Sequence, residues 1–210
     1  MSLIGENLER IRERIARAGD VQLIAVSKKV PPEGIEEALA AGQMLFGESK
    51  VQEAKAKIPV VSGRARWHMV GHLQSNKARD AVALFELIHS VDNISLAVEL
   101  DKWAERAGKT QAILLEVNVS GEVSKFGLKP EDVEAALERI NALRRVEVRG
   151  LMTIPPAGKE ARPFFRQLRE MRDRLGLTEL SMGMSHDFEV AIEEGATMVR
   201  IGTAIFGERQ

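Results

Sequence analysis

The chain has 210 residues, and 44% of them are hydrophobic, which is enough to bury a sizeable core. Lysine and arginine number 30 against 31 aspartates and glutamates, and this near balance argues against a nucleic-acid-binding surface as the main function. The chain has no cysteine, which excludes disulfide bonds, cysteine nucleophiles and thiolate metal sites.

The first predicted element is an amphipathic helix near the N-terminus. Its apolar residues recur at helical spacing and are expected on one face: Leu3, Ile4, Leu8, Ile11 and Ile15. The segment lacks the apolar stretch of a signal peptide, and no apolar run approaches the ~18 residues of a membrane span. We therefore expect a cytoplasmic protein without membrane contact.

After this helix, short apolar runs alternate with segments of helical periodicity. The predicted strands are 21–27, 44–47, 67–71, 87–91, 112–119, 146–154, 180–184 and 198–202. The predicted helices between them are 34–41, 50–58, 76–85, 94–107, 130–143, 162–175 and 186–194. Strict alternation of this kind predicts parallel strands joined by right-handed crossovers.

Eight strand–helix units favour a closed barrel over an open sheet. The fold class we predict is α/β: a single (β/α)8 TIM barrel over residues 1–210, with an extra N-terminal helix. No linker or change in composition divides the chain. Because TIM barrels usually have about 250 residues, the loops here must be short. A doubly wound open sheet is the alternative.

Small and hydroxyl residues follow the last two predicted strands. The active site of a TIM barrel lies at the C-terminal ends of its strands, and phosphate groups are commonly held after strands seven and eight. Gly183 permits a close backbone approach, and Ser185 is predicted to cap the next helix. Gly202 and Thr203 offer an unhindered amide and a hydroxyl. Arg200 shares the strand side of Gly202, so the sequence predicts an anion site here.

Two adjacent lysines, Lys28 and Lys29, follow the first predicted strand. Strand one neighbours strand eight in a closed barrel, so an amine at its end lies beside the predicted anion site. An amine next to a phosphate indicates Schiff-base chemistry with a phosphorylated carbonyl compound. Pyridoxal 5'-phosphate and the sugar phosphate of a class I aldolase both fit. Periodicity does not choose between the two lysines, which are expected on opposite sides of the strand.

Eight stretches, which occur in order over nearly the whole chain, are typical of one known family. They are AVSK (25–28), FGES with VQEAK (46–55), WHMVGHLQSNK (67–77), HSVD (89–92), SKFGL (124–128), RGLMTI (149–154), SMGMSHD (181–187) and VRIGTAIFG (199–207). In these motifs the chain resembles the pyridoxal phosphate homeostasis proteins, which share the N-terminal barrel of alanine racemase.

The resemblance implies that Lys28 carries pyridoxal 5'-phosphate as an internal aldimine. It implies that Arg200 faces the pyridine nitrogen, and that the phosphate is bound by Ser185, Gly202 and Thr203. The family usually has asparagine after FGE, where this chain has Ser49. We expect Ser49 near the cofactor, with one amide donor fewer.

The expected function is reversible cofactor binding in pyridoxal phosphate homeostasis, without robust catalysis. An alanine-racemase-like mechanism uses a tyrosine opposite the lysine, and this chain contains no tyrosine. The resemblance also implies delivery of the cofactor to apo-enzymes that depend on it. We expect a monomer rather than a homo-oligomer. The alternatives are a pyridoxal-phosphate-dependent amino-acid racemase and a class I Schiff-base aldolase.

Histidines and one further lysine complete the candidates. His68 and His72 have the spacing of helical metal ligands, but on a strand four residues span about 13 Å, so we expect no metal site. His72 is expected either to line the pocket or to lie on the surface. We interpret Lys125 as a solvated loop lysine, with a second cofactor amine as the alternative. His186 is assigned to the first turn of its helix.

Overall fold

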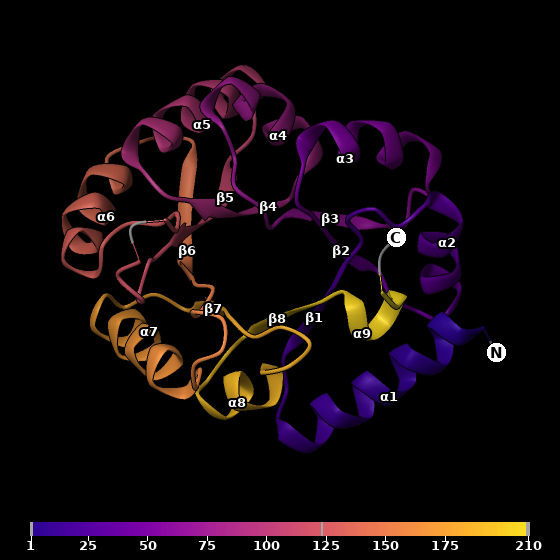
Figure 1. Cartoon of the computed structure of the whole chain (residues 1–210). Coiled ribbons are helices and arrows are strands. Elements are labelled where there is room, and N and C mark those ends of the chain that lie inside the picture. The colour runs from indigo at the N-terminus through magenta and orange to yellow at the C-terminus, as the bar shows by residue number, and fades with distance from the viewer. Residues whose placement is uncertain (1, 123, 209–210) are drawn as a thin grey trace.

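The computed structural model describes residues 2–122 and 124–208, and it is a closed barrel of parallel strands surrounded by helices (Figure 1). The strands follow one another around the barrel in chain order, and β8 pairs with β1. The predicted TIM barrel is therefore confirmed, and the open-sheet alternative is wrong. Among the described residues, no helix is both long and apolar enough to cross a membrane.

The strands are β1 (Gln22–Val26), β2 (Leu45–Glu48), β3 (Arg66–Met69), β4 (Leu87–Val91), β5 (Gln111–Glu116), β6 (Val146–Met152), β7 (Glu179–Ser181) and β8 (Met198–Ile201). The α-helices are α1 (Leu3–Ala18), α2 (Pro32–Ala40), α3 (Val51–Lys57), α4 (Ala78–Leu84), α5 (Ile94–Arg106), α6 (Val133–Asn141), α7 (Arg162–Arg174), α8 (Phe188–Glu193) and α9 (Thr203–Phe206). Short 3-10 turns are η1 (Ile58–Val60), η2 (Ser75–Lys77) and η3 (Pro130–Asp132).

Four strands end two or three residues earlier than the sequence predicts. They are β3, β5, β6 and β7, whose expected ends are 71, 119, 154 and 184. The case of β7 has a clear cause, because Gly183 adopts φ 91°, a left-handed conformation that extended strands do not use. The residues beyond these strands form the rim of the barrel instead, which is where a TIM barrel carries its functional groups.

Helix α1 covers the outside of the barrel between α8 and α2 (Figure 1). Its side chains Leu8, Ile11 and Ile15 are buried, as the apolar spacing predicts. Leu3 was expected on the same face, but it is 71% exposed, because it lies in the first turn at the helix end. The Ser2 hydroxyl accepts a hydrogen bond from the Gly5 amide (3.2 Å) and so caps this end.

The barrel interior is filled by inward-pointing side chains, one small set from each of seven strands or their ends: Ile24, Val26, Leu45, Val70, Leu87, Ala112, Leu114, Met152 and Met198. A second and larger apolar cluster lies between the strands and the helices. Burying one such aliphatic side chain contributes about 1.5–3 kcal/mol. The barrel interior is thus a packed core, and a ligand site is expected at an end of the barrel rather than inside it.

Candidate functional site

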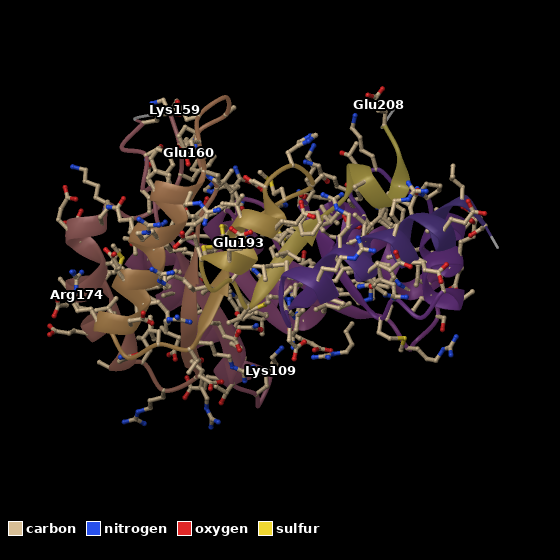
Figure 2. The ribbon with its side chains drawn as sticks, turned by 90° about the horizontal axis from the view of Figure 1, so that it is seen from below. Lys109, Lys159, Glu160, Arg174, Glu193 and Glu208 are labelled. Carbon is tan, nitrogen blue, oxygen red and sulfur yellow. The ribbon has the colours of Figure 1, made fainter. Side chains whose placement is uncertain are left out.

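A cavity of about 610 Å³ opens where the strands end. Figure 2 views the barrel from the side, with Lys109, which precedes β5, at one end and Lys159 and Glu208, which follow β6 and α9, at the other. The cavity belongs to the latter end. All six residues that the sequence analysis places at the cofactor line it: Lys28, Ser49, Ser185, Arg200, Gly202 and Thr203.

The β1–β8 pairing brings the lysine to this cavity. Ile24 pairs with Arg200 and Ala25 pairs with Ile201, so both strands end side by side. The chain then turns, and Lys28 lies in this turn as an exposed residue that lines the cavity. Lys29 is not among the lining residues, and its backbone amide donates a hydrogen bond to Glu53. The structure therefore separates two lysines that periodicity alone could not.

Gly183 makes its close approach to helix α8. A Cβ atom at this position would lie 2.6 Å from the Ala191 Cβ and 3.0 Å from the Phe188 Cα, and the φ of 91° also disfavours a side chain. The Gly183 carbonyl accepts a hydrogen bond from the Arg200 amide (3.0 Å). This glycine therefore packs α8 against the barrel and does not line the cavity.

Ser185 does not cap the helix that follows it, so that prediction was wrong. Helix α8 begins only at Phe188, because a turn at Met184 comes first, in which the Asp187 carboxylate accepts the Met184 amide (2.6 Å). The Ser185 hydroxyl instead accepts a long hydrogen bond from the Ala204 amide (3.4 Å). It thereby joins the loop after β7 to the first turn of α9, next to Thr203.

Arg200 is buried, with only 4% of its surface exposed, and projects into the barrel from β8. Its guanidinium donates to the Ser181 hydroxyl (2.5 Å) and to the Thr153 carbonyl (2.9 Å). Burial lowers the pKa of Arg200 to about 10, although the negative charges of Glu116 and Asp187 oppose this. At neutral pH the side chain is therefore still a cation, held in a fixed position by two acceptors.

A chain of hydrogen bonds continues from Arg200 across the barrel. Ser181 Oγ lies 2.8 Å from His89 Nδ1, and His89 Nε2 lies 3.0 Å from His68 Nδ1. Burial lowers the pKa of His68 to about 4 and that of His89 well below its usual value, so both rings are neutral near pH 7.

These contacts run in one direction because an arginine can only donate. The Ser181 hydroxyl accepts from Arg200 and donates its proton to His89 Nδ1. His89 must then carry its hydrogen on Nε2, from which it donates to His68 Nδ1, so we assign both histidines the Nε2–H tautomer. This chain of hydrogen bonds fixes the orientation of the Arg200 guanidinium. Sequence reasoning missed it, treating His68 only as a metal candidate and His89 only as part of a motif.

Metal binding has no support among the residues that the structure describes. No group of three or more histidine, aspartate or glutamate side chains is placed to hold an ion there. The Nδ1 atom of His68 is hydrogen-bonded to His89. His72 pairs with the Asp92 carboxylate at 3.2 Å and stacks on Phe126, with the ring centroids 3.7 Å apart. His72 does line the cavity, as one of its two expected placements proposed.

Two other polar residues at this end differ from their sequence-based interpretation, and a third had none. His186 lies in the turn before α8 and lines the cavity, rather than occupying the first helical turn. Lys125 is not simply solvated, since its amine pairs with Glu122 (3.6 Å) and lies 3.5 Å from the Ile154 carbonyl. Glu116 was not anticipated. It is buried at the end of β5, and its pKa is raised to about 7, mainly by burial and to a smaller extent by the charge of Asp92.

Comparison with known proteins identifies the family. The family described as "Alanine racemase, N-terminal domain" matches residues 1–210. The pyridoxal phosphate homeostasis protein of Aquifex aeolicus is 46% identical over an alignment of 217 residues. The alignment covers 97% of this chain and 95% of that protein. This chain belongs to the pyridoxal phosphate homeostasis protein family.

Solved structures of one family member support the same assignment. PipY of Synechococcus elongatus PCC7942, in a structure without PLP, superimposes with a TM-score of 0.90 at 44% identity. A structure of PipY with PLP bound gives a TM-score of 0.88 at 43% identity. Each match covers 97% of this chain and 100% of the PipY chain.

Proposed function

We propose that this protein binds pyridoxal 5'-phosphate reversibly through Lys28 and serves pyridoxal phosphate homeostasis without turning over a substrate. The observation that carries the proposal is that Lys28 lines the same cavity as Ser185, Gly202 and Thr203. The PLP-bound structure of PipY, at 43% identity, supports the choice of ligand. The cavity volume of about 610 Å³ also lies in the range of small-molecule sites.

When bound, the cofactor supplies an aldehyde carbon to which a lysine amine can add, forming a C=N Schiff base with loss of one water. Lys28 is the residue that we assign to this link. The hydroxyls of Ser185 and Thr203, with the backbone around Gly202, supply hydrogen-bond donors of the kind that phosphate oxygens need. Ser49, which lines the same cavity, is assigned a contact near the ring or its substituents.

The position of Arg200 favours a protein that binds the cofactor without catalysing a reaction on a substrate. In the assigned orientation, its cation faces the pyridine nitrogen and disfavours protonation there. An unprotonated ring withdraws electrons less strongly, which restrains chemistry at a bound amino acid. The contacts to Ser181 and Thr153 keep the guanidinium from moving away. The absence of tyrosine from the chain removes the usual second base of a racemase.

The amino-acid racemase alternative keeps one supporting observation. Glu116 has a pKa of about 7 and ends a strand whose residues Ala112 and Leu114 point into the barrel, so by alternation its side chain points the same way. A carboxyl group with that pKa can exchange protons near neutral pH. Incubation of the loaded protein with amino acids in heavy water separates the two functions. Deuterium at the α-carbon at about one turnover per second or faster favours a racemase.

The proposal extends to the setting of the protein. We propose a single-domain monomer of the cytoplasm, without nucleic-acid or membrane partners, that passes the cofactor to apo-enzymes. The shared name of its relatives, homeostasis proteins, supports the role in cofactor supply. A class I aldolase, the second alternative, predicts a covalent link with a sugar phosphate but none with pyridoxal phosphate.

A spectroscopic titration tests the proposed function. Pyridoxal phosphate added to the protein is expected to produce the visible absorption band of a Schiff base. The band is expected to disappear in Lys28→Ala and to persist in Lys29→Ala, the matched control one residue along. An unchanged band in Lys28→Ala, or none in the unaltered protein, contradicts the proposal.

A further inference from the structure

Three charged side chains form a cluster behind the turn that carries Lys28. Glu48 at the end of β2 lies opposite Lys57 at the end of α3, with the Lys57 amine 3.0 Å from Glu48 Oε1. The same amine lies 2.5 Å from Glu53 Oε1, one helical turn earlier in α3. We call Glu48, Glu53 and Lys57 the acid–lysine cluster. It lies on the outer side of the strands, since Val26 points into the barrel and the next residue, Ser27, points outward.

Two members of the cluster, Glu48 and Lys57, are buried, which is unusual for charged side chains, whereas Glu53 is partly exposed. Glu48 is 0% exposed and Lys57 is 7% exposed. Burial raises the pKa of Glu48, although the Ser27 hydroxyl and the Lys57 charge oppose the rise. Its second oxygen, Oε2, has no hydrogen-bond partner among the residues that the structure describes. An apolar pair in the same volume would avoid these desolvation costs, so the cluster calls for another explanation than stability.

The contacts of the cluster bracket Lys28. The Lys57 amine donates to the Ser27 carbonyl (2.6 Å), and the Ser27 hydroxyl donates to Glu48 Oε1 (2.7 Å). On the other side of Lys28, the Lys29 amide donates to Glu53. The residues before and after Lys28 therefore both bond to members of the same charged cluster.

The backbone at Lys29 adopts a conformation that needs such support. Among the described residues, Lys29 is the one non-glycine residue with positive φ, at 60°. This left-handed conformation is strained for a lysine, because its side chain forms no local hydrogen bond that offsets the strain. A residue keeps such a conformation when contacts with the surrounding structure hold its backbone there. The hydrogen bond from its amide to Glu53 is the contact that does so here.

We propose that Glu48, Glu53 and Lys57 are positioning residues that fix the backbone on both sides of Lys28 and so place its amine for reaction with the aldehyde of pyridoxal phosphate. This inference rests on the proposed function. The cluster does not touch the ligand cavity, because none of its three residues lines it. Its effect is therefore on the rate at which the amine reaches the aldehyde, not on the phosphate contacts at Ser185 and Thr203.

Two ligands distinguish an effect on the placement of the Lys28 amine from damage to the binding cavity. Pyridoxal 5'-phosphate reports both binding and the covalent link, whereas 4-deoxypyridoxine 5'-phosphate keeps the ring and phosphate but lacks the aldehyde. Stopped-flow absorbance gives the rate of Schiff-base formation with the first ligand, and calorimetry gives the affinity for the second. A role confined to folding would change both values together or neither.

The first variant is Lys57→Met, which keeps an unbranched apolar stem and removes the amine. Because it leaves Glu48 buried without a cation, it is expected to be less stable. The second variant combines Glu48→Gln with Lys57→Met, which removes both buried charges and leaves only the partly exposed Glu53. The matched control is Lys55→Met, on the same helix, whose amine pairs with Asp80 at 3.0 Å and makes no contact with the turn.

Both cluster variants are expected to form the Schiff base about ten- to a hundredfold more slowly, with the affinity for 4-deoxypyridoxine 5'-phosphate unchanged and the control like the unaltered protein. If Lys57→Met does not fold, the double variant decides. Unaltered rates in a folded variant overturn the inference, and so does an equal loss of rate and analogue affinity. If the unaltered protein itself forms no Schiff base, the proposed function fails first, which distinguishes the two failures.

Discussion

Ile24 of β1 and Arg200 of β8 are register partners across the seam that closes the barrel. This pairing explains why residues from opposite ends of the chain form one site. Lys28 follows Ile24 at the end of its strand, and Gly202 follows Arg200 at the end of the neighbouring one, so both reach the same cavity. The amine and the hydroxyl groups that suit a phosphate are thus brought together by ring closure, which no local sequence feature provides.

The link between Arg200 and the two histidines can be tested by Ser181→Ala. The change removes the hydroxyl between the Arg200 guanidinium and His89 Nδ1, and it leaves buried groups without a partner. We expect a loss of about 1–3 kcal/mol in the free energy of unfolding, measured by urea denaturation. The control Ser95→Ala, at an exposed position of α5, is expected to change it by less than about 0.5 kcal/mol. Equal stability of the two variants contradicts the proposed hydrogen-bond chain.

Acid should destabilise the fold through His68. Its folded-state pKa of about 4 lies below the usual 6.5, so between these values the unfolded chain binds a proton that the folded protein does not. Stability contributed by the neutral ring is therefore complete above about pH 6.5 and is lost as the pH falls towards 4. We expect His68→Gln to flatten this part of the stability curve, as measured by urea midpoints. A slope unchanged in this variant shows that the ring is not buried and neutral.

Glu116 should act with the opposite sign. Its folded-state pKa of about 7 lies above the usual 4.5, so between these values the folded protein binds a proton that the unfolded chain does not. Stability is therefore lost as the pH rises from about 4.5 to about 7, and the loss is complete above that. We expect Glu116→Gln to match the unaltered protein near pH 4.5 and to be more stable above pH 7 by about 3 kcal/mol. Chemical denaturation at both pH values measures this. A variant that is less stable at high pH contradicts the buried carboxyl.

The approach of α8 to the barrel predicts a cost for Gly183→Ala. The added methyl group meets Ala191 at 2.6 Å and the left-handed φ is also strained, so we expect a loss of roughly 2–4 kcal/mol by urea denaturation. Gly158→Ala is the matched control, because φ is 74° there but no atom lies within 4 Å of the added carbon. It should cost only about 1 kcal/mol. Equal costs at both positions contradict a packing role for Gly183.

Ser49 offers a test of the ligand contact at the cavity. Restoring the asparagine that the family usually has, with Ser49→Asn, adds an amide at a residue that lines the cavity. We expect the affinity for pyridoxal phosphate to rise by about fivefold, the value of one net hydrogen bond. Equilibrium titration measures it, with the analogue that lacks an aldehyde as a second ligand. A weaker affinity shows that the space beside Ser49 does not admit the larger side chain.

The barrel could be predicted from the sequence because it depends on alternation, which repeats over many residues. The positions of Lys28 and Arg200 at one cavity followed from that topology. Side-chain networks could not be found in this way. His89 and Ser181 lie on strands buried on both faces, where an apolar pattern does not show which residues point inward. Glu48 and Lys57 meet through a fold contact across nine residues, which neither residue indicates in the sequence.

Local boundaries were the weaker part of the sequence-based interpretation, for a related reason. Ser185 has the residue type of a helix cap, but Asp187 competes for the same turn and α8 starts later. The start of the helix depends on which of two nearby side chains accepts the hydrogen bond from the backbone amide. The resulting shift also explains why His186 faces the cavity rather than joining the helix.

The most direct test of the central claim is chemical trapping of the lysine. The protein is loaded with pyridoxal phosphate, reduced with borohydride, weighed intact and then mapped by peptide mass spectrometry. We expect one reduced phosphopyridoxyl group per chain, on Lys28 and not on Lys29. A label on another lysine, or no label at all, contradicts the account.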